Sequence, residues 1–160
     1  MEEDTLSEIK TRAAMDTAVR ILTSRGHTSS ELARKLKSRQ IKPDIVSRVV
    51  AECERLNYIN DAGTAQQYLE ELKRKGYGRR YVLTAMRKKG LDVEIIEDVL
   101  HRGYPESEER ENAIIMLKKK LPAFNREKDP YKRKSKIYRY LYNRGFSPEV
   151  ITAVVNSMAD

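Results

Sequence analysis

The stretch that decides the fold occurs three times in this chain: LKSRQIKPDIVSRVV at residues 36–50, MRKKGLDVEIIEDVL at 86–100 and LYNRGFSPEVITAVV at 141–155. The three segments align without gaps. Apolar residues occupy the same columns, a basic residue stands at the fourth position of each segment, and an acidic residue stands at the ninth. Internal repeats spaced by about fifty residues are typical of stacked helical arrays.

Each segment predicts the end of one helix and the start of the next. The basic column suits the negative end of a helix dipole, and it consists of Arg39, Lys89 and Arg144. Gly90 and Gly145 follow, as expected for the left-handed residue that ends many helices. Copy one has Gln40 there, which predicts either backbone strain or a different turn. The next helix then begins with proline or valine, and Asp92 and Ser147 are its expected N-caps.

The match extends backwards along the chain to two further helices in each copy. An apolar residue lies four positions before each segment, on the same face of a helix; these residues are Leu32, Val82 and Ile137. Further back, the pattern Ala-x-x-x-Leu begins at Ala18, Ala65 and Ala113. Thr28 and Glu31 have the spacing of a capping box. We therefore predict helices at 6–25, 29–39, 43–56, 60–75, 79–89, 92–102, 106–121, 131–143 and 147–158.

The predicted fold class is all-α, an elongated, curved array of three tandem three-helix repeats. Residues 1–58 would hold an acidic N-terminal helix start plus repeat one, residues 59–104 repeat two, and residues 105–160 repeat three. The apolar columns are interpreted as the core of this scaffold, and by themselves they carry little information about function.

Composition narrows the setting in which the protein works. The charged fraction is 35%, above the roughly 25% of ordinary globular chains, and wide solvated helix faces would account for it. No apolar run approaches the roughly 18 residues of a transmembrane helix, and the acidic start lacks a signal-peptide pattern. The single cysteine, Cys53, cannot form an internal disulfide. We expect a cytoplasmic protein without membrane association.

The basic charge is concentrated in two parts of the chain. The net charge is +8, yet residues 72–91 and 118–144 together carry +17, so the remainder carries −9. Both stretches cover the same part of their repeat, and stacking would bring them onto one side. Tyrosines are interleaved with the cations, a combination that can hold phosphates and stack on bases. The alternative is that the tyrosines pack with the core and the cations are merely solvated.

On this pattern we predict a face that binds a partner or nucleic acid. The residues assigned to it are Arg79, Arg80, Lys88, Lys89, Lys132, Arg133, Lys134, Lys136, Arg139 and Arg144.

No motif for catalysis, metal binding or phosphate binding is found in the sequence. The only histidines are interpreted as a turn residue, His27, and a helix C-terminal residue, His101. Neither belongs to a His-Glu-x-x-His motif, and a lone cysteine cannot complete a structural zinc site. The Gly-Tyr-Gly at 76–78 is too short for a phosphate loop and is interpreted as a helix connection.

Adjacent acids give no sign of a catalytic pair either. Glu108 and Glu109 are expected on a polar helix face, as are Glu70 and Glu71. We therefore expect a protein that is not an enzyme and that uses no cofactor and no metal.

Four motifs in order resemble those of the RecX family of recombination regulators: RGHTSSEL at 25–32, LNYIND at 56–61, GYGRR at 76–80 leading to MRKKGL at 86–91, and RGFS at 144–147. The similarity runs from about residue 13 to 158. The sequence departs from the family pattern at two places. Gln40 replaces the usual glycine, and the pair Gly63-Thr64 replaces bulkier residues.

This resemblance implies a cytoplasmic bacterial protein that binds the RecA recombinase filament in its helical groove. Family members span neighbouring subunits, restrain ATP hydrolysis and strand exchange, and so act in recombination, DNA repair and the SOS response. Some also bind single- or double-stranded DNA directly. We expect a monomer. Two alternatives remain open: a general nucleic-acid-binding module without RecA dependence, and a scaffold that binds an acidic protein and no DNA.

Overall fold

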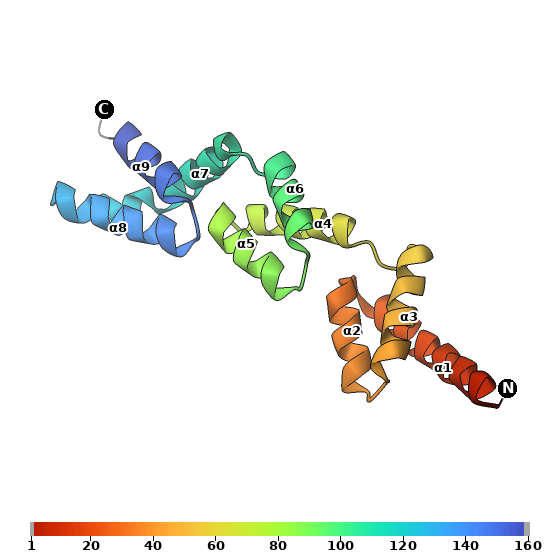
Figure 1. Cartoon of the computed structure of the whole chain (residues 1–160). Helices are drawn as coiled ribbons and strands as arrows, with labels where there is room; N and C mark the ends of the chain where they lie inside the picture. Colours follow the sequence, from red (N-terminus) through yellow and green to blue (C-terminus); the bar gives the residue numbers. More distant parts are fainter. Residues whose placement is uncertain (1, 159–160) are drawn as a thin grey trace.

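The computed structural model describes residues 2–158, which form an elongated array of helices (Figure 1). No strand occurs among these residues. The helices are α1 (Glu2–Ser24), α2 (Ser29–Ser38), α3 (Pro43–Arg55), α4 (Asp61–Arg74), α5 (Arg79–Lys88), α6 (Val93–Gly103), α7 (Glu106–Phe124), α8 (Pro130–Asn143) and α9 (Pro148–Ser157). The predicted all-α array of three-helix repeats is confirmed.

Each repeat has its own hydrophobic core. The buried residues fall into three clusters, one for α1–α3, one for α4–α6 and one for α7–α9. The first apolar column of the repeated segment lies at the centre of these clusters, because Leu36, Met86 and Leu141 are all fully buried. Burying one such side chain contributes roughly 1.5–3 kcal/mol. The helix pairs that pack extensively all belong to one repeat, so each repeat folds around local contacts.

The predicted helix boundaries hold within three residues, except at the first helix. α1 begins at Glu2 rather than at residue 6, because the chain before Leu6 is acidic and acids suit the positive N-terminal end of a helix. α7 continues through Pro122 to Phe124, which packs on the core of repeat three and lies edge-on to the ring of Tyr140.

The predicted N-cap positions are confirmed, but only the capping box has its side-chain hydrogen bonds. Thr28 and Glu31 form the expected capping box. Asp92 and Ser147 occupy N-cap positions, but neither side chain makes the capping hydrogen bond. The hydroxyl of Ser147 instead donates to the carboxylate of Glu109, with 2.8 Å between the oxygens. That bond directs the serine side chain away from the start of its own helix.

The turn between the second and third helix has the same geometry in every repeat. Gly90 and Gly145 have φ angles of +75° and +83°, and Gln40 has +62°. The sequence left open whether copy one strains or changes its turn. Copy one adopts the same turn as the other two copies. A non-glycine residue with left-handed backbone costs on the order of 1–2 kcal/mol of stability.

No helix in the described part of the chain is long and apolar enough to cross a membrane.

Candidate functional site

The joint between repeats two and three is a contact between two main chains. At the start of α5, the N–H of Gly78 donates to the carbonyl of Arg144 and the N–H of Arg80 donates to that of Gly145, both at 2.9 Å. A side chain at Gly78 would overlap the backbone of Phe146. The α8–α9 turn and the first residues of α5 therefore lie in direct backbone contact.

Glu109 lies inside this joint, so its assignment to a polar helix face is wrong. It is 1% exposed. Its carboxylate accepts hydrogen bonds from the N–H of Arg79 at 3.0 Å and the N–H of Ser147 at 2.9 Å. The first N–H groups of a helix have no partner within that helix. Glu109, a residue of repeat three, thus caps α5 of repeat two. The sequence did carry a signal that Glu109 is buried, because it stands four residues before Ala113 and so lies on the inward face of α7.

Arg144 fastens the same joint from its other side. Its guanidinium donates to the carbonyls of Gly76 at 2.9 Å and Lys75 at 2.5 Å. It also lies over the rings of Tyr77 and Tyr140, at 5.1 and 5.8 Å from their centroids. The guanidinium is therefore engaged with the end of α4 and with two aromatic rings, which keeps the two repeats in register.

The joint between repeats one and two lies at the equivalent place and relies on side chains. The hydroxyl of Thr28 donates to the carbonyl of Lys89 at 2.8 Å, and the N–H of Ser29 donates to the carboxylate of Asp61 at 2.8 Å. The ammonium of Lys89 lies 3.6 Å from the carboxylate of Glu31. It also lies 4.7 Å from the ring centroid of Tyr68.

Glu31 is stabilised as a carboxylate in this joint. Burial alone would raise its pKa, but the hydrogen bond from the N–H of Thr28 and the charge of Lys89 outweigh burial, so the pKa is lowered. Lys89 and Arg144 come from the same column of the repeat. Both stand among the predicted binding residues, and the structure places both in joints.

The other predicted residues lie on the second helices of repeats two and three. On α5, Arg80 and Lys88 are exposed and Arg79 is half-buried. On α8, Arg133 is half-buried and the other cations are exposed; these are Lys132, Lys134, Lys136 and Arg139. In Figure 1, α5 lies in the middle repeat and α8 in the last, each on the lower left side of its repeat.

Some cations of α8 are engaged with the loop before it. The guanidinium of Arg133 donates to the carbonyl of Glu127 at 3.0 and 2.8 Å. The ammonium of Lys136 pairs with the carboxylate of Glu127 at 2.7 Å, which lowers the pKa of that carboxyl group. Lys132, Lys134 and Arg139 are thus better placed to meet a partner than Arg133 and Lys136.

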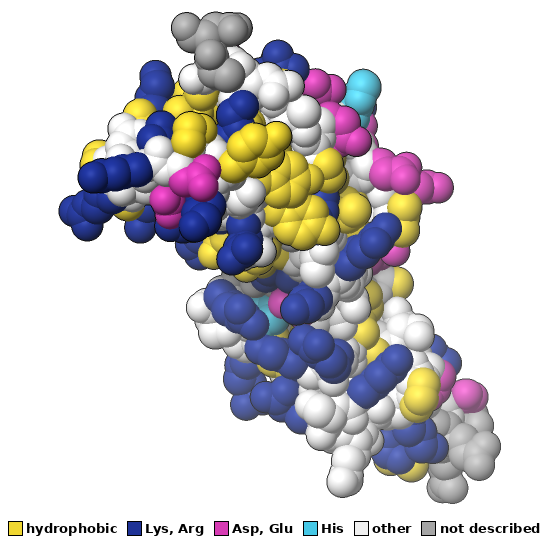
Figure 2. Space-filling model, turned by 90° about the vertical axis from the view of Figure 1, so that its left-hand side faces the viewer, with side chains coloured by type: hydrophobic (Ala, Val, Ile, Leu, Met, Phe, Trp, Pro, Cys, Tyr) yellow, Lys and Arg dark blue, Asp and Glu magenta, His cyan; other side chains and the backbone are white. Residues whose placement is uncertain are grey.

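Tyrosines connect the basic residues across the joint. The rings of Tyr77 and Tyr81 stack at 3.8 Å, and those of Tyr138 and Tyr142 at 6.1 Å. The guanidinium of Arg80 lies 4.0 Å from the ring centroid of Tyr142 and so joins the two pairs. Figure 2 shows hydrophobic side chains gathered among the cations in the upper part of this face. Partly exposed rings beside cations can stack on bases while the cations hold phosphates.

Repeat one also contributes to the basic surface, which the sequence reasoning missed. Lys and Arg side chains crowd the lower half of Figure 2 as well as the upper half. Around α2, Arg25, Arg34, Lys37, Arg39 and Lys42 are exposed, while the nearby acid Glu31 is buried. The repeat could have predicted this part of the surface, because α2 is the counterpart of α5 and α8. We call the exposed basic surface of α2, α5 and α8 the basic face.

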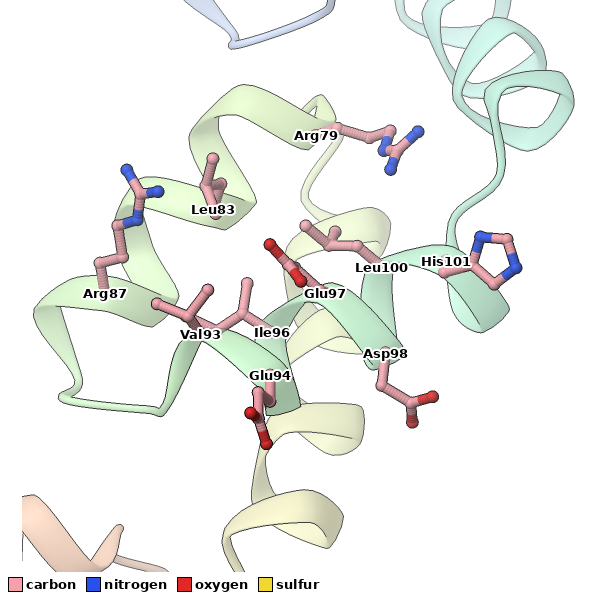
Figure 3. Close-up of a pocket in the computed structure, with 10 residues that line it drawn as sticks. All are labelled: Arg79, Leu83, Arg87, Val93, Glu94, Ile96, Glu97, Asp98, Leu100 and His101. Carbon is pink, nitrogen blue, oxygen red and sulfur yellow. The ribbon is translucent and has the colours of Figure 1, made fainter.

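The basic face ends at α6. A groove of about 650 Å³ separates α5 from α6. Figure 3 shows Arg79 and Arg87 on its α5 side. On the α6 side it shows three acidic residues, Glu94, Glu97 and Asp98. Acids repel anionic groups such as phosphates, so α6 bounds the basic surface on this side of α5.

The fold and this surface define a class, the helical-repeat binding proteins, in which stacked units offer one long surface. In the described part of the chain, no cluster of three or more His, Cys, Asp and Glu side chains is arranged to hold a metal ion.

The family follows from comparison with known proteins. The RecX models of the first, second and third three-helix domain match residues 14–53, 60–100 and 107–155. Regulatory protein RecX of Deinococcus radiodurans is 35% identical over 153 residues, covering 96% of this chain and 72% of that protein. The Legionella pneumophila protein of the same name is 32% identical, covering 88% and 91%. This chain belongs to the RecX family.

Solved structures confirm the fold. The crystal structure of RecX from Lactobacillus salivarius superposes with a TM-score of 0.87 at 23% identity, covering 95% of this chain and 98% of that one. The relatives named above are regulatory proteins, which supports a regulatory role for this chain.

Proposed function

We propose that this chain is a cytoplasmic regulator that binds the RecA recombinase filament in its helical groove and restrains ATP hydrolysis and strand exchange. Membership of the RecX family supports the regulatory role. The observation that carries the proposal is the basic face, in which exposed cations and tyrosines of α5 and α8 are held in register by a backbone joint. An array of three units has the length to bridge successive subunits of a filament.

Within this proposal the predicted residues have two different roles. Lys89 and Arg144 hold neighbouring repeats together and so shape the basic face. The exposed cations meet phosphates or acidic groups of the filament and its DNA. Exposed ion contacts are worth only about 0.2–1 kcal/mol each, so binding depends on several of them acting together.

The test removes four exposed cations in one variant. We expect Lys88→Ala, Lys132→Ala, Lys134→Ala and Arg139→Ala together to weaken binding to RecA–single-stranded DNA filaments by roughly tenfold, since each contact contributes a few tenths of a kcal/mol. The salt dependence should also become less steep, because fewer counterions are released. The readouts are fluorescence anisotropy and the ATP hydrolysis rate of the filament.

A matched control removes four cations from the first and third helices. The changes are Arg12→Ala, Arg48→Ala, Arg55→Ala and Arg102→Ala, and all four positions are exposed. Filament binding by this control should resemble that of the parent. If the two variants weaken binding equally, net charge alone is responsible and the basic face has no special role.

The second candidate function is nucleic-acid binding without RecA, which the tyrosine and arginine stack across the joint favours. It predicts equal affinity for bare DNA and for filaments, and no effect on ATP hydrolysis beyond competition for DNA. Tight filament binding together with weak binding to bare DNA would eliminate it.

A further inference from the structure

Repeat one carries an open groove at the place where repeats two and three receive their neighbour. In the two joints, the start of α2 or α5 lies against an acid of the next repeat, Asp61 or Glu109. Both acids stand four residues before the alanine of the Ala-x-x-x-Leu pattern. The same position in repeat one is Ala14. Among the described residues, the groove at this surface is lined by repeat one alone.

The uncovered surface is hollow and has an apolar floor. A groove of about 410 Å³ lies between α1 and the start of α3. Ala14 and Ile45, which are 3% and 5% exposed, form its floor, and Ile41 lies half-buried beside them. A second hollow of about 290 Å³ adjoins it, since Thr17 and Arg39 line both.

The groove carries more positive charge than the equivalent surfaces of repeats two and three. Where repeats two and three have Asp92 and Ser147, repeat one has Lys42, and Lys10 and Arg39 line the same groove. The adjoining hollow adds two more cations, Arg20 and Lys35. None of the described residues that line the two hollows is acidic. A helix N-terminus, which carries partial positive charge, is therefore disfavoured here.

The turn at Gln40 also selects the occupant. In the joints, glycine at this position allows close approach, because a side chain at Gly90 would overlap Ser30 and one at Gly145 would overlap Tyr81. Gln40 has a side chain that is exposed and lines the groove. An occupant must therefore enter with its side chains, without close backbone contact.

We propose that the groove formed by Lys10, Ala14, Arg39, Lys42 and Ile45 binds an acidic segment of a partner protein. Apolar side chains of the segment rest on Ala14 and Ile45, and its carboxylates pair with the three cations. The joint between repeats one and two supplies a precedent, since the ammonium of Lys89, the counterpart of Arg39, faces the carboxylate of Glu31. The site shares Arg39 and Lys42 with the α2 part of the basic face, but it contains none of the cations of α5 and α8 that the test of the proposed function removes.

The probe is a short end-blocked peptide in which glutamate alternates with leucine, labelled with fluorescein. It is titrated into the full chain, and a peptide with glutamine in place of glutamate serves as the comparison. We expect the acidic peptide to bind and to shift the amide NMR signals of Ala14, Gln40 and Ile41. The glutamine peptide should bind on the order of tenfold more weakly, because three exposed ion pairs are lost.

Three variants locate the site. Lys10→Glu, Arg39→Glu and Lys42→Glu together should abolish measurable binding. The control reverses the same number of charges at exposed positions of repeat one outside the groove: Arg25→Glu, Arg34→Glu and Lys37→Glu. It should keep affinity within about twofold, because none of these three side chains lines either hollow and exposed ion contacts contribute only about 0.2–1 kcal/mol each.

The third variant, Ala13→Trp, leaves the charge unchanged and fills the groove from an exposed position, so it should block the peptide and leave the fold intact.

Three outcomes would overturn the proposal: equal loss in both charge variants, equal binding of both peptides, or unchanged binding by Ala13→Trp. Self-association of the chain that disappears with Lys10→Glu, Arg39→Glu and Lys42→Glu would identify a second copy as the occupant and also refute it. The quadruple variant of α5 and α8 should bind the peptide normally. The peptide test therefore does not depend on the cations of α5 and α8, and a negative result for those cations leaves it unaffected.

Discussion

The two joints perform the same task with different chemistry. Between repeats two and three, two main-chain hydrogen bonds, the buried Glu109 and the guanidinium of Arg144 hold the contact. Between repeats one and two, the contact depends on side chains, and its acid, Asp61, is only half-buried. Backbone contacts leave little freedom, whereas side-chain contacts can rearrange at low cost. The last two repeats therefore form a stiff pair, and the first repeat is attached more loosely.

The largest expected effect comes from placing a side chain in each joint. Gly145→Ala should destabilise the protein by about 3 kcal/mol or more, because it adds left-handed strain and an overlap with the backbone of Tyr81. Gly90→Ala should cost about 1–2 kcal/mol, because its overlap is with the Ser30 side chain, which can move. Urea unfolding of both variants measures the difference.

A second substitution in the looser joint sharpens this comparison. Ser30→Gly should recover part of the stability lost in Gly90→Ala, because the overlapping hydroxyl is gone. Equal costs for Gly145→Ala and Gly90→Ala would mean that the two joints are equally rigid.

The next effect compares the two acids. Glu109→Ala leaves the N–H groups of Arg79 and Ser147 without a partner in a buried place, and should cost about 2–4 kcal/mol. In Asp61→Ala, water can reach the N–H of Ser29 and replace the lost carboxylate, so the cost should be only about 1 kcal/mol. Thermal unfolding followed by circular dichroism gives both values. A larger loss for Asp61→Ala would contradict the ranking.

Acid should loosen the first joint through Glu31. Its pKa is lowered on folding, so its contribution to the free energy of unfolding is present above the ordinary glutamate pKa of 4.5 and is lost as the pH falls through the lower folded value. Glu31→Gln keeps an oxygen that can accept from Thr28 and removes the charge. Its unfolding free energy should vary less with pH below 4.5 than that of the parent. Parallel pH profiles for the two proteins would argue against this role.

The smallest effect concerns the turn at Gln40. Gln40→Gly should stabilise the protein by about 0.5–1 kcal/mol, since relief of left-handed strain exceeds the added entropy of the unfolded chain. Chemical denaturation can resolve a change of this size. A loss of stability would show that the glutamine side chain makes a favourable contact.

The sequence predicted the helices well because their signals are local. Leu36, Met86 and Leu141 repeat at fixed spacing and are all fully buried. Turns and caps also depend on neighbouring residues, so the capping box at Thr28 was predictable. Ser147 is the N-cap residue that the sequence predicted, but the partner of its hydroxyl could not be predicted, because it is Glu109, 38 residues away in the chain.

The site was harder to predict because charge does not reveal which residue faces a neighbour. Arg144 and Lys134 are both cations in one basic stretch, yet Arg144 reaches Gly76, 68 residues away, and Lys134 is exposed. Their different roles become visible only once the packing of one repeat on the next is known. The cations of α2 were missed for a different reason, since they fall outside the two stretches used to define the face.

Gln40 also distinguishes the outer face of repeat one from the two faces that form joints. In the joints, Gly90 and Gly145 leave room for the second helix of the neighbouring repeat, whereas Gln40 carries a side chain at the same position. At the other end, α8 has 14 residues against 10 in α2 and α5, and its start at Pro130 lacks the N–H that a following unit would use. At both ends of the described array, the outer face therefore lacks a feature on which the two joints rely.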